Sequence, residues 1–359
     1  MAEVLYNTAG ALLSYLPYII STPTAPGPSS ASSPPPPPAP PYAHHNLQHY
    51  LSTAVIPNMK LASTVPSVFE TGSKSPADYL KIHHESYREL QSMQKIDDFR
   101  ALVRNFSARV LPATPTDGQE RYPDITVPAP GYDVLPRHED APNKLQTVVD
   151  WVKSFPIRTI HRIMQLVFPA MLKYDMTVEQ DHDGALIQWI KWAIDADTVT
   201  ESADMTRPAM TVFVQAPWIV SKKDLEAFVT TSVFPKKSLA IVPYRDVQRR
   251  WGKVYDICSR NRSHYFVLTT YWGWVFGAFS EEYTRAWVSE VIPSQSQDPT
   301  VLQCLFYWFA SALDCPKSWK IPMVSDEISW PPSTFRSVCP IRSDGQLDDK
   351  VLGALSSWP

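Results

Sequence analysis

Two adjacent stretches, His264-Tyr-Phe-Val-Leu-Thr-Thr270 and Trp272-Gly-Trp-Val-Phe-Gly-Ala-Phe279, decide the fold class of this chain. Both are rich in aromatic and β-branched residues, which fit the pleated surface of a strand better than the crowded surface of a helix. Only Tyr271-Trp272-Gly273 lies at their junction, a connection short enough for a hairpin. The sequence therefore predicts two antiparallel neighbouring strands in residues 264–279.

Further strands and helices are expected on both sides of this hairpin. Residues 210–215 and 238–242 are short β-branched runs, whereas 246–259 has apolar residues at helical spacing. The apolar residues of this helix form one stripe: Val247, Trp251, Val254, Tyr255 and Cys258. Helical spacing returns in 281–291 and 300–313, so strands and helices alternate through this half of the chain.

The segment before residue 210 predicts helices. Residues 144–155 and 157–174 have helical periodicity and are separated by Pro156, and 178–195 continues with apolar residues at similar spacing. Residues 144–330 then follow the order helix–strand–strand–helix–strand–strand–helix. This order predicts an α/β (α+β) domain with a small mixed sheet flanked by helices.

Outside this domain, the chain divides by composition. Proline is abundant, with 35 residues against 11 glycines. We expect an apolar N-terminal segment in 1–21, a disordered Pro/Ser-rich tether in 22–75 and a Pro-rich connection in 111–143, because such stretches bury little and lack backbone donors. Residues 76–110 have the three- and four-residue apolar spacing of a helical element, and 331–359 predict an extended tail.

Composition and charge exclude some classes of protein. The 359 residues carry 33 Lys and Arg against 36 Asp and Glu, for a formal net charge of −3. This balance argues against a dedicated basic nucleic-acid binder, although a local patch remains compatible with it. A hydrophobic fraction of 44% excludes a wholly disordered chain.

The cysteines and the N-terminus indicate the compartment. Cys258, Cys304, Cys315 and Cys339 form no C-x-x-C pair and no dense framework, so we expect reduced thiols and no zinc site. Residues 4–20 lack the basic start of a secretory signal, and polar residues interrupt their apolar run. An intracellular protein, cytoplasmic or nuclear, is expected, with membrane contact through residues 4–20 as an alternative.

The element order and the Tyr-Phe-Val-Leu-Thr-Thr texture resemble the core of the PD-(D/E)XK, or restriction-endonuclease-like, superfamily. In that core a helix precedes a strand with Pro-Asp, a second strand ends in Glu-x-Lys, and a helix opening with Gln leads to an aromatic strand and its hairpin partner. The likeness covers residues 177 to 280. The chain also resembles uncharacterised proteins of mushroom-forming fungi that share the Tyr-Phe-Val-Leu-Thr and Trp-Val-Phe-Gly stretches.

Carried over to this chain, the resemblance implies a degenerate nuclease motif. Pro208 matches the motif proline, but Ala209 stands where the metal-binding Asp belongs. Pro243 and Arg245 lie where Glu-x-Lys is expected, and Gln248 matches the helix Gln. A phosphodiesterase needs carboxylate ligands for Mg²⁺. The resemblance therefore implies an inactive member that binds no metal and no cofactor.

Other residues keep a catalytic alternative open. Asp181, His182 and Asp183 place acidic groups beside an imidazole, a combination suited to acid–base or metal chemistry. At the start of the helix expected in 178–195, the same acids would simply complement the helix dipole. Phosphate-cradling Gly-rich loops, a Gly-x-Ser-x-Gly turn and a His-Glu-x-x-His motif are absent from the sequence.

A cluster of basic residues is the remaining candidate surface. Its members lie within 236–262 and are interleaved with aromatic residues, as in faces that bind a nucleic-acid backbone. The alternative is a helix with one solvated basic side and one aromatic core side. The members singled out for a partner or nucleic-acid face are Lys236, Lys237, Arg249, Arg250, Lys253 and Arg260.

The sequence therefore favours a non-catalytic interaction or accessory protein on a degraded nuclease-like core, with a protein as its partner. Three alternatives stay open. One is an enzyme whose site is assembled from distant residues such as Asp181, His182 and Asp183. The others are a nucleic-acid-binding protein and a membrane-associated accessory protein.

Overall fold

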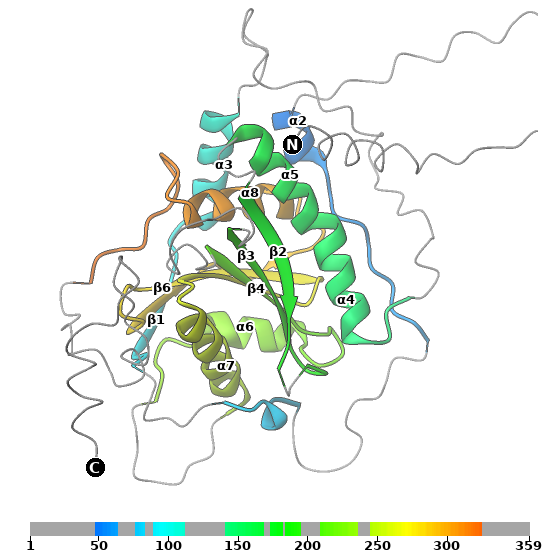
Figure 1. Cartoon of the computed structure of the whole chain (residues 1–359), viewed down its shortest axis with the longest axis vertical. Helices are drawn as coiled ribbons and strands as arrows, with labels where there is room; N and C mark the ends of the chain where they lie inside the picture. Colours follow the sequence, from blue (N-terminus) through cyan, green and yellow to red (C-terminus); the bar gives the residue numbers. More distant parts are fainter. Residues whose placement is uncertain are drawn as a thin grey trace, which may run out of the picture. The chain divides into compact units, whose positions relative to one another are not determined.

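The described residues form an open mixed sheet of eight strands, with the hairpin of residues 264–279 near its middle (Figure 1). The strand order is β1-β7-β6-β5-β4-β3-β2, and β8 pairs with β6. The bounds are β1 Ser92–Lys95, β2 Tyr174–Glu179, β3 Gln188–Ile194, β4 Met210–Val214, β5 Tyr265–Thr269, β6 Gly273–Phe279, β7 Arg285–Val288 and β8 Ile292–Pro293. The predicted mixed sheet flanked by helices is confirmed.

The computed structural model describes residues 47–63, 76–82, 89–111, 141–168, 173–181, 184–194, 209–235 and 245–324. All of them belong to one compact unit, Tyr42–Pro359. The expected apolar segment 1–21, the strand 238–242 and the tail 331–359 lie outside the described residues, as does nearly all of the Pro-rich connection 111–143. None of the described helices has the length and apolarity that a membrane span requires.

Helices cover both faces of the sheet, and aromatic side chains join the layers. The ring centre of Trp251 in α7 lies 6.0 Å from that of Phe266 and 6.2 Å from that of Phe279. On the opposite face, Trp308 of α8 contacts Tyr265 and Phe276. Alternate strand residues thus meet different helices. The helices are α2 Leu47–Thr53, α3 Phe99–Val110, α4 Leu145–Val152, α5 Arg158–Val167, α6 Lys222–Thr230, α7 Asp246–Asn261 and α8 Val301–Ala312, besides the 3₁₀ turn η1 Pro76–Tyr79.

Two segments expected to be helical are strands. The described part of 178–195 belongs to the antiparallel β2–β3 hairpin, and 281–291 contain β7. Ile187, Trp189, Ile190 and Trp192 are all buried, because β3 is covered on both faces. A strand that is buried on both faces has a continuous run of apolar residues and no alternation of apolar and polar ones. In β3, some of these apolar residues happen to lie three or four positions apart, which resembles helical spacing.

The N-terminal part of the fold also differs from expectation. The helical element predicted in 76–110 contains the strand β1, which pairs in parallel with β7, and among its described residues only α3 is an α-helix. The tether predicted in 22–75 includes α2, whose Leu47, Tyr50 and Leu51 are buried. The segments α2 and β1 are short, and they are stabilised by packing against distant parts of the chain. Local apolar periodicity does not reveal such long-range packing.

Pro156 lies within a helix and does not end it. The π-helical turn Lys153–Ile157 joins α4 directly to α5, so the two expected helices are one irregular helix. A π turn is a common way to accommodate a residue without a backbone N–H inside a helix. The buried Ile157 and Val152 stay in the core on either side of it.

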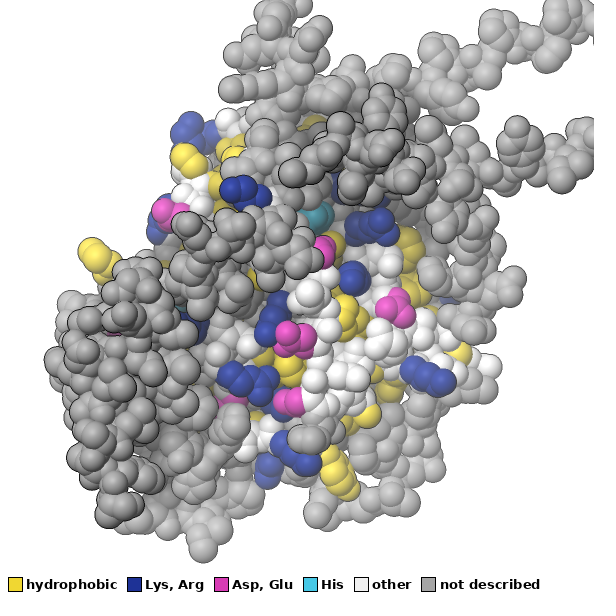
Figure 2. Space-filling model, in the orientation of Figure 1, with side chains coloured by type: hydrophobic (Ala, Val, Ile, Leu, Met, Phe, Trp, Pro, Cys, Tyr) yellow, Lys and Arg dark blue, Asp and Glu magenta, His cyan; other side chains and the backbone are white. Residues whose placement is uncertain are grey.

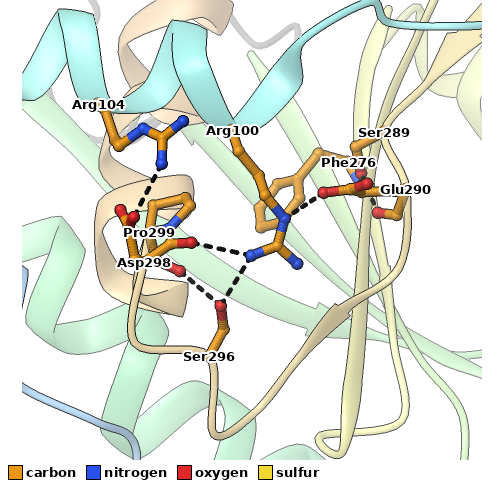
Figure 3. A network of polar contacts seen from close by, with 8 residues as sticks. All are labelled: Arg100, Arg104, Phe276, Ser289, Glu290, Ser296, Asp298 and Pro299. Atoms are coloured by element: carbon orange, nitrogen blue, oxygen red, sulfur yellow. Dashed lines mark hydrogen bonds and ion pairs between the residues drawn. The ribbon is translucent and has the colours of Figure 1, made fainter.

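Arginine side chains of α3 fasten this helix to the segments before and after β8 (Figure 3). The Arg100 guanidinium pairs with Glu290 and donates to the Asp298 carbonyl oxygen at 2.9 Å and to Ser296 Oγ at 3.3 Å. One turn later, Arg104 Nη1 lies 2.8 Å from Asp298 Oδ2. The α3 helix is thereby tied to residues almost two hundred positions later in the chain.

A glycine in β6 makes room for a core phenylalanine. Gly277 is the cross-strand partner of Phe266, and a Cβ atom built on Gly277 would lie 2.3 Å from Phe266 Cζ. Alanine in place of glycine usually stabilises a strand by lowering the entropy of the unfolded chain. Here the steric conflict with a fully buried ring opposes that gain.

We therefore expect Gly277→Ala to lower the free energy of unfolding by about 1–3 kcal/mol, because Phe266 must leave its rotamer. Urea denaturation of the purified chain measures this. Adding Phe266→Leu to Gly277→Ala should cost less than the sum of the two single changes, because the smaller side chain relieves the clash. A Gly277→Ala protein as stable as the wild type would contradict the prediction.

His161 of α5 is held in its neutral form by its surroundings. The Trp192 Nε1–H group donates to His161 Nδ1 at 3.1 Å, and the Gln165 side-chain amide lies 2.8 Å from His161 Nε2. An indole N–H can only donate, so Nδ1 must keep its lone pair. Protonation of His161 at Nδ1 would place its new N–H group against the N–H group of Trp192, so that two donors would face each other.

Acid should therefore destabilise the fold through His161. Burial lowers the pKa of His161 below 6.5, Arg162 and Arg158 lower it further, and Asp175 opposes them. As the pH falls, His161 is therefore protonated in the unfolded chain before it is protonated in the folded protein. The stability that neutral His161 contributes is complete above pH 6.5 and is lost progressively below it. We expect the urea midpoint to fall more between pH 7.5 and 5 in the wild type than in His161→Gln. Equal pH dependence of the two proteins would refute this.

Candidate functional site

Of the candidate residues Asp181, His182 and Asp183, the structure describes Asp181. This residue lies just after β2 and forms an ion pair with Lys253 of α7. Its Oδ2 atom lies 2.8 Å from Lys253 Nζ. His182 and Asp183 lie outside the described residues. The expected position of Asp181 at a helix start is wrong, because β2 and β3 replace that helix. Asp181 and Lys253, predicted as members of two separate candidate sites, are thus neighbours.

Lys253 is buried among these contacts. Its side chain is only 4% exposed, and its ammonium group also donates to the Lys81 carbonyl oxygen at 3.0 Å. An ammonium group removed from water needs such charge and hydrogen-bond compensation. The pair with Asp181 therefore holds three pieces of chain together: the end of β2, the middle of α7 and the segment after η1.

A network of glutamine side chains lies next to this pair. Gln188 Nε2, at the start of β3, donates to Gln180 Oε1 at 2.9 Å and to the Gly184 carbonyl oxygen at 3.0 Å. A Cβ atom on Gly184 would lie 2.6 Å from Gln180 Oε1, so a side chain there would disturb the network. Gln215, directly after β4, reaches toward the Leu186 carbonyl oxygen at 3.5 Å. The carboxyl ends of β2 and β4 therefore meet at the turn that leads into β3.

A second buried cation of α7 pairs with the start of α6. Arg250 has a 4% exposed side chain, and its Nη1 atom lies 3.1 Å from Asp224 Oδ1. Asp224 and Ser221 form a capping box, with Ser221 N donating to Asp224 Oδ2 at 2.8 Å. Burial would raise the pKa of Asp224, but hydrogen bonds from Ser221 and the charge of Arg250 outweigh it and lower the pKa. Asp224 is thus a structural anion.

The last exposed cation of α7 packs on an indole ring. Arg260 Cζ lies 5.7 Å from the ring centre of Trp189, within the range of a cation–π contact. Trp189 Nε1 donates to Glu179 Oε2 at 3.2 Å, and Lys191 Nζ lies 2.8 Å from Glu179 Oε1. Glu179 of β2 thus pairs with Lys191 of β3, next to the Trp189 ring that Arg260 of α7 covers.

The predicted basic face is divided by the structure. Arg250 and Lys253 are buried, Arg249 is half-buried, and Arg260 is exposed, while Lys236 and Lys237 lie outside the described residues. On the face of the molecule in Figure 2, Lys and Arg side chains are interspersed with Asp and Glu. The described residues of this set therefore form no continuous positive stripe of the kind that a phosphate backbone favours.

The degenerate motif positions have structural roles where they are described. The Ala209 N–H donates to the Trp192 carbonyl oxygen at 2.9 Å, just before β4 begins. Arg245 precedes α7, and its backbone N–H donates to Gln248 Oε1 at 2.9 Å, so Gln248 caps the helix. Pro208 and Pro243 lie outside the described residues. In the sheet, β4 pairs directly and in parallel with β5.

Several residues that contact α7, β2 or β3 were not predicted from the sequence. Ser221 and Asp224 have the spacing of a capping box, a signal that could have located the start of α6. The contacts of Gln188, Glu179 and Lys191 depend on the β2–β3 register, which an expected helix concealed. Within the described part of the chain, no three His, Cys, Asp or Glu residues gather closely enough to hold a metal ion.

Removing the partner of Lys253 should destabilise the protein. We expect Asp181→Ala to lower the free energy of unfolding by about 2–3 kcal/mol, less than for a fully buried pair because Asp181 remains partly solvated. Asp181→Ala combined with Lys253→Met should recover much of this loss, since no buried charge is then left without compensation. Urea denaturation compares the three proteins.

The exposed pair of Lys222 and Glu226 in α6, with an N···O distance of 3.7 Å, provides the control. Glu226→Ala should change the free energy of unfolding by at most about 0.5 kcal/mol. If Asp181→Ala were equally harmless, the pair with Lys253 would not be a structural element.

Similarity to known proteins adds nothing to this geometry. No protein-family model, curated protein or solved structure matches the chain. The relation to the PD-(D/E)XK superfamily therefore stays a prediction.

Proposed function

We propose that this chain is a non-catalytic interaction protein built on a restriction-endonuclease-like core, with another protein as its partner. The element order supports the choice of core. The helix α5 is followed by the antiparallel strands β2, β3 and β4, then by the two helices α6 and α7, and then by β5, which is parallel to β4 and has the hairpin partner β6. The resembled family has a comparable order of helix, strands, helix, aromatic strand and hairpin partner.

The buried ion pair of Asp181 and Lys253 is the observation on which the non-catalytic role depends. A carboxylate that binds Mg²⁺ or activates water needs free lone pairs facing a site open to substrate. Asp181 instead faces an ammonium group at 2.8 Å whose side chain is 4% exposed. Asp224, the other described acid that pairs with α7, is held by Ser221 and Arg250. Both acids therefore act as supports for the fold.

The mixed charge of the face in Figure 2 favours a protein over a nucleic acid as the partner. A polyanion is attracted by a continuous basic surface, and its affinity rises steeply as salt is lowered. Interspersed charges of both signs instead provide complementarity to a protein surface with its own pattern. Arg260, exposed and seated on Trp189, is a rigid cationic group of the kind enriched in protein interfaces.

A cleavage and binding assay tests this proposal. The purified chain, supplied with Mg²⁺ or Mn²⁺, should leave labelled DNA and RNA uncut and should not shift their fluorescence anisotropy at low salt. Asp181→Asn, which keeps the shape but removes the charge, serves as the matched variant. Metal-dependent cleavage by the wild type that disappears in a folded Asp181→Asn protein would overturn the proposal in favour of an enzyme.

A second assay addresses the partner. Proteins that co-purify with the wild-type chain should bind Arg260→Glu at least about tenfold more weakly, because an interfacial charge reversal commonly costs a few kcal/mol. Lys222→Glu, a change on the exposed surface of α6, serves as the control and should bind normally. Equal binding by both variants would exclude the Arg260 surface as the contact.

A further inference from the structure

A cavity of about 360 Å³ lies between α2, α3 and α8, away from the ion pairs of α7. The short helix α2 contributes Gln48, His49 and Ser52 to its lining. Ser52 Oγ donates to the His49 carbonyl oxygen at 2.9 Å, which fixes the orientation of this side chain. The volume is within the range of sites for small molecules.

The α3 helix contributes a cation to the cavity. Arg104, Ser107 and Ala108 lie three and four positions apart and so share one face of the helix. Arg104 Nη1 is bound to Asp298 Oδ2 at 2.8 Å, as Figure 3 shows. A guanidinium group has five N–H donors, and no other bond of Arg104 to a described residue occupies the remaining ones.

One buried polar atom of the lining, Ser107 Oγ, lacks a partner among the described residues, and the Gln303 side chain adds donors that make no hydrogen bond there. Ser107 is 3% exposed, and its Oγ atom makes no hydrogen bond there. Gln303 of α8 is 7% exposed, and its Oε1 atom accepts from the Thr300 backbone N–H at 3.0 Å, while its Nε2 donors make no such bond. Buried polar groups are normally satisfied, so Ser107 Oγ indicates a partner that the described residues do not supply.

We propose that this cavity binds a small anion, with a carboxylate or phosphate group that accepts hydrogen bonds from Arg104, Ser107 and Gln303. No lining residue is acidic, and Asp298, the carboxylate bound to Arg104, does not line the cavity. The guanidinium, hydroxyl and amide groups supply donors of the kind that bind an oxyanion. Ala108 leaves space for the remainder of the ligand.

Titration calorimetry of the full chain tests this site, with inorganic phosphate and succinate as probes. Ser107→Ala removes the unpartnered hydroxyl group and should weaken anion binding about tenfold. Gln303→Glu keeps an acceptor for the Thr300 N–H, as in a capping box, but places negative charge in the cavity. This variant should therefore lose binding altogether.

Arg109→Gln, a change on the exposed surface of α3 outside the lining, is the control and should bind like the wild type. Urea denaturation without anion shows whether each variant is folded, and Ser107→Ala should be at least as stable as the wild type. Binding of phosphate alone or of succinate alone would support the site and identify its class of ligand. Failure of the wild type to bind either anion, or undiminished binding by folded Ser107→Ala and Gln303→Glu, would overturn the proposal.

Discussion

Two positive charges buried on one helix constrain much of this structure. The side chains of Arg250 and Lys253 in α7 are each 4% exposed, and each requires an anion at a fixed place. Asp224 meets the first requirement and so fixes the start of α6 against α7. Asp181 meets the second and brings the end of β2 to the same helix. Aromatic packing of Trp251 against the sheet then completes the layer.

This constraint links the fold to the proposed function. Asp181 and Asp224 hold α7 to the end of β2 and to α6, and charges of both signs lie on the surface shown in Figure 2. The cavity beside α3 has a different character, because the buried Ser107 hydroxyl group in its lining has no partner among the described residues. Interaction with a protein and binding of a small anion would therefore take place at separate positions and through different physical interactions.

An element of this fold could be predicted from the sequence where its apolar residues recur with the period of a helix or a strand. The hairpin of β5 and β6, the strand β4 and the helices α7 and α8 were predictable, because their β-branched or striped patterns are local. The hairpin of β2 and β3 was not, because burial on both faces of β3 hides its alternation. Asp181 and Lys253 were both singled out, but their contact crosses 72 residues and required the correct strands.

The parallel pairing of β1 with β7 has a consequence for the order of folding during synthesis. Ser92 pairs with Arg285, and the Thr300 hydroxyl donates to the Leu51 carbonyl oxygen, so β1 and α2 find these partners only after residues 285–300 have been synthesised. Closing so long a loop is entropically costly and slow. Residues 89–111 must therefore wait on the ribosome with their apolar side chains unprotected, a period in which a chaperone would be most useful.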